Sequence, residues 1–151
     1  LNNSTKTQIK NALDKIEVSY REIPVVKSEN GTFELTEANG TKHAAIDGTG
    51  YMSTQTDSWR SWEMEVAEDG TYDIFIVYIP ENLDKRYSFE CGDNAIAHTL
   101  PGVDPMIQTS YVGKMNLKAG KQTFRLDQAD RCYPLEPLGL EVKKIIVRKS
   151  L

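Results

Sequence analysis

The chain has 151 residues, of which 39% are hydrophobic and 26% charged, and its formal net charge is −4. A chain of this length buries about two thirds of its unfolded surface, so we expect one domain with one core. Having only two cysteines excludes a disulfide-dense scaffold. The 18 basic and 22 acidic residues lack the broad basic footprint of a nucleic-acid-binding protein. No apolar run has the ~18 residues that a membrane span needs.

The first twenty residues differ from the rest in their hydrophobic period. Ile9, Leu13 and Ile16 recur at helical spacing, which predicts a short amphipathic helix. The same segment could also be a linker that is helical only when docked. From Ile16 onward the period is two, and Pro24 then interrupts it, which is typical of an edge strand.

The middle of the chain carries the clearest strand signals. Trp62, Met64 and Val66 alternate with charged residues, which predicts a half-buried strand with Trp62 in the core. After an expected hairpin turn at residues 68–70, residues 72–79 are apolar on both faces. This pattern is typical of a central strand that is covered on each side.

Turn signals continue at short intervals in the second half. Gly92 and Asp93 predict a two-residue hairpin of type II′, and residues 119–120 predict another hairpin. The proline-rich residues 101–105 suit a connection between two sheets. A slip in the apolar parity at residues 143–144 indicates a β-bulge.

Nine or ten short strands at regular spacing predict an all-β fold. We expect an antiparallel β-sandwich, or jelly roll, with a short N-terminal helix. The expected domains are an N-terminal helix or linker with an edge strand, residues 1–28, and the β-sandwich, residues 29–151.

Signatures of catalysis are absent from the sequence. There is no Gly-x-Ser-x-Gly elbow, and residues 48–50 lack the third glycine of a dinucleotide-binding loop. His43 and His98 lie far apart without cysteine pairs, so a zinc site is not indicated. A Cys–His dyad is not indicated either, because Cys91 and Cys132 sit where core or disulfide roles are commoner. A carboxylate pair at catalytic distance would arise by chance among 22 acidic residues. We therefore expect no enzymatic activity in this chain.

Three runs, taken in order, resemble a known group of proteins. They are residues 61–66 with 69–78, residues 117–126, and residues 140–147. Their order and spacing are similar to galactose-binding-like β-sandwich modules. These include carbohydrate-binding modules of the family 6 and family 35 type and the C-terminal domain of bacterial α-L-fucosidases. The resemblance implies a non-catalytic module that binds sugar through loop aromatics, often with a structural calcium ion.

The resemblance implies which residues of this chain correspond to the sugar-binding residues of the group. Tyr51 falls near the first sugar-stacking aromatic of the group, and Tyr111 falls on the aromatic of its "T-G-x-W" run. The closing asparagines of the group fall on Glu141 and Lys143, so that end of the usual cleft is altered.

The resemblance also implies where calcium would bind, and further candidates come from the residues themselves. Glu34 and Glu37 lie on the strand where the group places its calcium-binding carboxylates. Trp59 lies on the loop side of its strand, where it could stack on a sugar or plug the end of the sandwich. A late loop combines an aromatic with charged side chains that suit sugar hydroxyls. The candidate carbohydrate-binding residues are Tyr51, Trp59, Tyr111, Tyr133, Asp130, Arg131 and Glu136.

The favoured function is therefore a carbohydrate-binding or accessory module of a glycan-degrading protein, attached to a glycoside hydrolase such as an α-L-fucosidase. The alternative is a structural module that packs on a glycoside hydrolase domain without its own ligand. A stand-alone enzyme ranks third. We expect the protein to be secreted, periplasmic or on the cell surface after removal of an export signal. In that setting a disulfide between Cys91 and Cys132 becomes possible.

Overall fold

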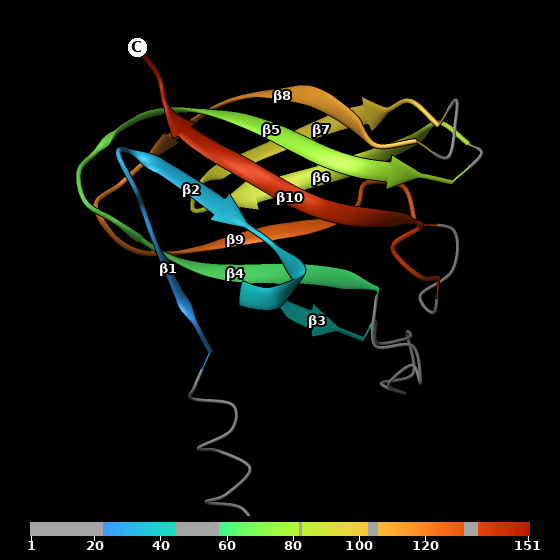
Figure 1. Ribbon diagram of the computed structural model, residues 1–151, viewed down its shortest axis with the longest axis horizontal. Coiled ribbons are helices and arrows are strands. Elements are labelled where there is room, and N and C mark those ends of the chain that lie inside the picture. The colour runs from blue at the N-terminus through green and yellow to red at the C-terminus, as the bar shows by residue number, and fades with distance from the viewer. Residues whose placement is uncertain (1–22, 45–57, 82, 103–105, 132–135) are drawn as a thin grey trace, which may run out of the picture.

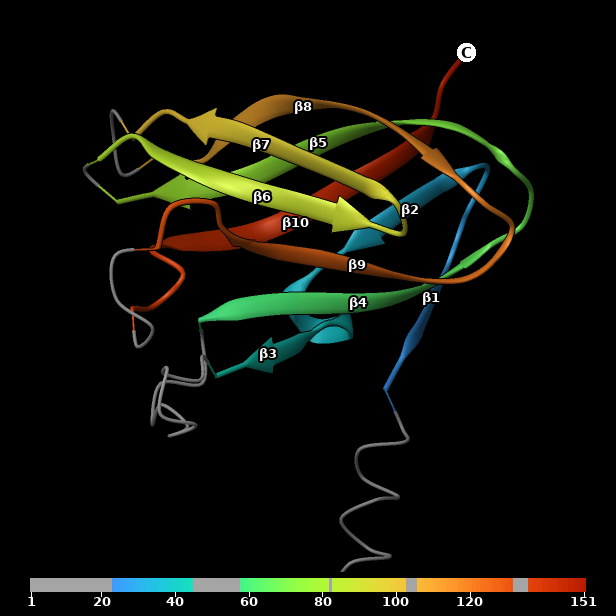
Figure 2. The same cartoon turned by 180° about the vertical axis from the view of Figure 1, so that it is seen from behind.

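Two β-sheets packed face to face form the molecule (Figures 1 and 2). The computed structural model describes residues 23–44, 58–81, 83–102, 106–131 and 136–151. The elements are β1 Val25–Lys27, β2 Thr32–Leu35, the 3-10 helix η1 Glu37–Asn39, β3 Thr41–His43, β4 Trp59–Val66, β5 Gly70–Pro80, β6 Lys85–Cys91, β7 Asn94–Leu100, β8 Gln108–Leu117, β9 Gly120–Gln128 and β10 Leu140–Lys149.

The strand order assigns each element to one layer. Sheet A has six strands in the order β1-β4-β9-β6-β7, with β3 also pairing with β4. Sheet B has four strands in the order β2-β10-β5-β8. The pairs are antiparallel except that of β1 with β4. This architecture confirms the prediction of an all-β sandwich.

The core lies between the sheets, where alternate residues of each strand point inward. Trp62, Met64 and Val66 of β4 are buried, as the alternation predicted. Ile74 and Ile76 of β5 meet them from sheet B and are also fully buried. β5 lies between β10 and β8, which confirms the prediction of a central strand.

A tight corner beside η1 closes one edge of the core. The Nε1 of Trp62 donates a hydrogen bond to the Thr36 carbonyl at 2.8 Å. Asn39 accepts from the Thr36 amide at 2.7 Å and donates to the Glu34 carbonyl at 3.0 Å. Gly40 lies against the indole of Trp62, where a Cβ would be 2.8 Å from Cε2. The corner therefore requires glycine for lack of space.

Several predicted turns have the expected geometry. Gly92 has a φ of 60° in the β6–β7 hairpin while Asp93 does not have a positive φ, as a type II′ turn requires. The register of β10 shifts between Val142 and Lys144, so the predicted bulge is confirmed. Residues 101–107 connect β7 of sheet A to β8 of sheet B, also as predicted.

The prediction of hairpins at residues 68–70 and 119–120 is wrong. Each turn instead carries the chain from one sheet to the other, because β4 and β9 belong to sheet A whereas β5 and β8 belong to sheet B. Turn residues and apolar alternation are alike for a hairpin and for such a crossover. Only the pairing of distant strands decides between them.

The predicted N-terminal helix falls in residues 1–22, which lie outside the described residues. Within the described ranges the helical structure is limited to η1. The described residues contain no helix that is long and apolar enough to cross a membrane.

Cys91 has a free thiol at the inner face of β6, and burial raises its pKa to about 11. The possible disulfide with Cys132 is therefore not formed. Cys132 itself lies outside the described residues, but its neighbour Arg131 follows the end of β9. That end pairs with Tyr87, near the opposite end of β6 from Cys91.

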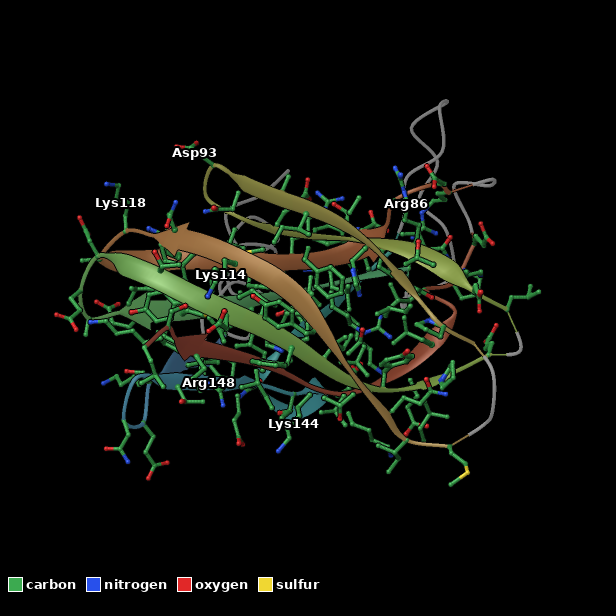
Figure 3. All side chains as sticks on the ribbon, turned by 90° about the horizontal axis from the view of Figure 1, so that it is seen from above. Arg86, Asp93, Lys114, Lys118, Lys144 and Arg148 are labelled. Atoms are coloured by element: carbon green, nitrogen blue, oxygen red, sulfur yellow. The ribbon has the colours of Figure 1, made fainter. Side chains whose placement is uncertain are left out.

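The two ends of the sandwich differ in the length of their connections. One end, here called the tight end, has the short connections 28–31, 67–69, 92–93 and 118–119. The other, here called the loop end, has the connections 44–58, 81–84, 101–107 and 129–139. In Figure 3 Arg86 marks the loop end, and Asp93 and Lys118 mark the tight end.

Candidate functional site

Trp59 lies at the loop end, on the outer face of sheet A, as the first residue of β4. The ring of His43 stacks on its indole, with ring centroids 3.7 Å apart and an interplanar angle of 11°. The guanidinium of Arg125 lies 4.1 Å from the centroid of the Trp59 ring. Because β3 and β9 flank β4 on opposite sides, both faces of the indole are covered. Trp59 is therefore a fixed anchor for Arg125 rather than an open stacking surface.

Arg131 joins the start of β4 to the end of β9. Its Nη2 donates to the Ser58 carbonyl at 2.7 Å and to Asp127 Oδ1 at 2.6 Å, and its Nη1 donates to the Glu136 carbonyl. The other oxygen of Asp127 accepts from Arg125 Nη2 at 3.1 Å. One carboxylate thus holds two guanidinium groups in a fixed arrangement beside Trp59.

The remaining charged candidates lie beside this network. Asp130 forms an ion pair with Arg86 at 3.2 Å, and its side chain is 72% exposed. Glu136 pairs with Lys85 at 3.5 Å. The structure therefore brings Asp130, Arg131 and Glu136 to the same end as Trp59. The carboxylate of Asp130 is the one most open to a ligand.

Two of the aromatic candidates, Tyr51 and Tyr133, lie outside the described residues. In the sequence, Tyr51 belongs to the connection that leads into Trp59, and Tyr133 follows Arg131. Both connections belong to the loop end.

Tyr111 lies on the outer face of sheet B, so the structure does not bring it to Trp59. It is 46% exposed, and its hydroxyl donates to Asp73 Oδ1 at 2.9 Å. Lys114 and Ser150 bind the same carboxylate. These hydrogen bonds, that of Lys114 foremost, lower the pKa of Asp73.

The two carboxylates expected to bind calcium are occupied by cations. Arg60 is buried, and its Nε donates to both oxygens of Glu37, at 3.1 and 3.3 Å. Lys42 lies 3.7 Å from Glu37, and Lys144 lies 3.6 Å from Glu34. In the described ranges no three His, Cys, Asp or Glu side chains gather as a metal site requires. The residues present at this corner therefore do not fit a calcium ion.

A histidine and a serine meet beside Trp59, and their surroundings do not suit catalysis. His43 Nε2 and Ser61 Oγ are 2.7 Å apart. Burial first, then the charges of Arg125 and Arg60, lower the pKa of His43. Nearby cations oppose the imidazolium that a Ser–His pair must form during nucleophilic attack. We assign this pair a structural role.

The sequence analysis missed Arg125, Asp127 and His43. The outward parity of residues 125 and 127 on one strand is a weak signal that could have indicated exposure. Their position beside Trp59 depends on the register of β4 with β9, in which Ser61 pairs with Arg125. No local pattern specifies that register.

Solved structures with the same architecture identify the fold. No family model and no curated protein matches the sequence. A family 35 carbohydrate-binding module from Clostridium thermocellum matches 79% of this chain and 98% of its own, with a TM-score of 0.56 and 13% identity. The chain has the family 35 fold.

Two further structures agree with this assignment. The family 35 module of Cellvibrio japonicus Abf62 matches 80% of this chain and 94% of its own, with a TM-score of 0.56 and 18% identity. The GH26-CBM35 β-(1,4)-mannanase of Podospora anserina matches 82% of this chain, with a TM-score of 0.57 and 18% identity. This chain spans only 28% of the mannanase. The comparisons give no support to the narrower link with α-L-fucosidases.

Proposed function

We propose that this chain is a non-catalytic glycan-binding module whose site is the loop end of sheet A. The observation that carries the proposal is the network beside Trp59, in which Asp127 holds the guanidinium groups of Arg125 and Arg131. Its fold is that of carbohydrate-binding modules, some of which belong to longer enzymes.

The chemistry of the network suits a polyhydroxylated ligand. Guanidinium groups donate paired hydrogen bonds to vicinal hydroxyls or to a sugar carboxylate, and Asp130 accepts from hydroxyl groups. Because the indole faces of Trp59 are covered, stacking would come from Tyr51 and Tyr133, whose connections belong to this end. A shallow site of this kind binds with Kd values of about 1 µM to 1 mM.

A glycan array with the full chain, followed by titration calorimetry on the best ligand, tests the proposal. Arg125→Ala removes a guanidinium from the network and should weaken binding at least tenfold, about 1.4 kcal/mol. Tyr111→Ala is the matched control, because it removes an exposed side chain from the other sheet. Binding that is lost in Tyr111→Ala and kept in Arg125→Ala would refute the assignment to the loop end.

The same experiment addresses calcium. Since Glu34 and Glu37 are held by Lys144 and Arg60, binding measured with a chelator should equal binding without it. A ligand retained only in the presence of calcium would require a metal site elsewhere in the chain. We also propose that the module accompanies a glycoside hydrolase domain and is exported from the cell.

A further inference from the structure

Apolar side chains occupy the middle of the outer face of sheet B. Phe75, Val77 and Ile79 take successive outward positions on β5 and are only half-buried. Ile146 of β10 lies opposite Phe75 on one side, and Tyr111 of β8 lies opposite it on the other. The sequence predicted that this strand would be covered on both faces.

The structure covers only one face of β5. Its inner residues pack against sheet A, whereas no element of the described ranges packs on the outer face (Figure 3). Just before β8, Ile107 extends the apolar surface and is 61% exposed. Branched aliphatic side chains of this kind pack on protein rather than stack on sugar rings. The outer face of sheet B, here called the apolar face, therefore fits a protein surface.

Charges of both signs lie beside the apolar side chains on this face. Lys114 pairs with Asp73 at 2.7 Å, and Lys144, in register with Val77, pairs with Glu34 at 3.6 Å. Arg148 differs, because its guanidinium lies 4.9 Å from the ring centroid of Phe75. For Arg148 the described residues show no ion pair with a carboxylate. A partner with a carboxylate at this point would form an ion pair with Arg148.

The face itself carries the complementary charge. Along β10, Arg148 pairs in register with Asp73 and Glu141 pairs with Ile79, so the two lie at opposite ends of the outer row of β10. The carboxylate of Glu141 is 59% exposed and forms a surface ion pair with Lys143 at 2.8 Å, which a partner's guanidinium would share. A two-fold axis across the strands, between the rows of Phe75 and Val77, would place each Arg148 over Glu141 of the partner subunit. The face is in this sense self-complementary.

The area is compatible with a weak dimer. Three strands of 10 or 11 residues and the four-residue β2, about 4.8 Å apart and with 3.4 Å per residue, give a face of roughly 570 Å². Two such faces bury about 1,150 Å², which is the size of a weak, transient interface. From the apolar rows, the charge arrangement and this area, we propose that a second copy of the chain docks on the apolar face.

Sedimentation equilibrium on the full chain, up to about 1 mM, tests this proposal. The wild type should form a dimer, and Val77→Lys should abolish it. Arg148→Glu should weaken the dimer at least tenfold, and the double variant Arg148→Glu with Glu141→Arg should restore it. Restoration identifies a contact between copies, because the register separates the two residues within one chain. Ala97→Lys, on the exposed outer face of β7, is the matched control.

Each outcome bears on the proposal. A wild type that remains monomeric at the highest concentration overturns it, as does a Val77→Lys variant that dimerises normally. If Val77→Lys fails to fold, the exposed Arg148 variants decide alone, and a double variant as weak as Arg148→Glu overturns the proposal. A wild type that stays monomeric, together with a folded Val77→Lys that loses glycan binding, would overturn the proposal and assign the face to the glycan instead.

Discussion

Replacing Gly40 with alanine tests whether the corner beside η1 is as tight as its geometry implies. The new Cβ would lie 2.8 Å from Cε2 and 2.9 Å from Cδ1 of Trp62, well inside ordinary contact. Either the indole or the turn must move. Overpacking of this kind costs about 1–3 kcal/mol. Loss of the Trp62–Thr36 hydrogen bond adds about 1 kcal/mol. The expected loss in the free energy of unfolding is therefore about 2–4 kcal/mol.

Urea unfolding followed by tryptophan fluorescence measures this loss, because Trp62 is completely buried. Gly70→Ala is the matched control. Its new Cβ would have ordinary contacts, the nearest at 3.4 Å to Lys149, and Gly70 does not have a positive φ. The control should change stability by no more than about 0.5 kcal/mol. If Gly40→Ala is as stable as Gly70→Ala, the reasoning from the corner geometry is refuted.

Three further substitutions address other contacts. Arg60→Met removes the buried cation from Glu37, whose side chain is 32% exposed. The free energy of unfolding should fall by about 1–2 kcal/mol. An unchanged urea midpoint would contradict this prediction. His43 has a lowered pKa in the fold, so the unfolded chain binds its proton first and stability should fall as the pH drops through about 6.5. His43→Gln should flatten this part of the plot of stability against pH. An identical plot for the variant would show that His43 does not cause the fall in stability. Tyr87→Phe removes a buried hydroxyl that donates to the Leu138 carbonyl at 2.9 Å and should cost about 1 kcal/mol in thermal or urea unfolding; an effect near zero would show that the bond contributes no net stability.

Features that depend on neighbouring residues could be predicted from the sequence. The alternation of Trp62, Met64 and Val66 gave the inner face of β4 because a buried strand face imposes a period of two. The parity slip in β10 gave the bulge for the same reason. Features that depend on pairing between distant strands could not be predicted. The turns after β4 and β8 cross between sheets, and no residue in them distinguishes a crossover from a hairpin.

The candidate site was likewise predictable only in part. Trp59 and Arg131 stand out in the sequence because an aromatic or a guanidinium in a loop is chemically distinctive. The partners of Trp59 do not stand out, because His43 and Arg125 are far from it in the sequence. They come close to it only through the pairing of β3 and β9 with β4. The sequence left Trp59 as either a sugar-stacking aromatic or a plug at the end of the sandwich, and its contacts show an indole held between an imidazole and a guanidinium.

The contrast between the two ends of the sandwich has a consequence for how this protein can change. At the tight end, connections such as 67–69 and 118–119 link the sheets with almost no spare chain, so an insertion there would shift the register of whole strands. At the loop end, the connections 44–58 and 129–139 can lengthen or vary without moving the core. Mutations that alter ligand preference can accumulate at one end while the other preserves the scaffold. A library designed for a new ligand should therefore randomise the loop end alone.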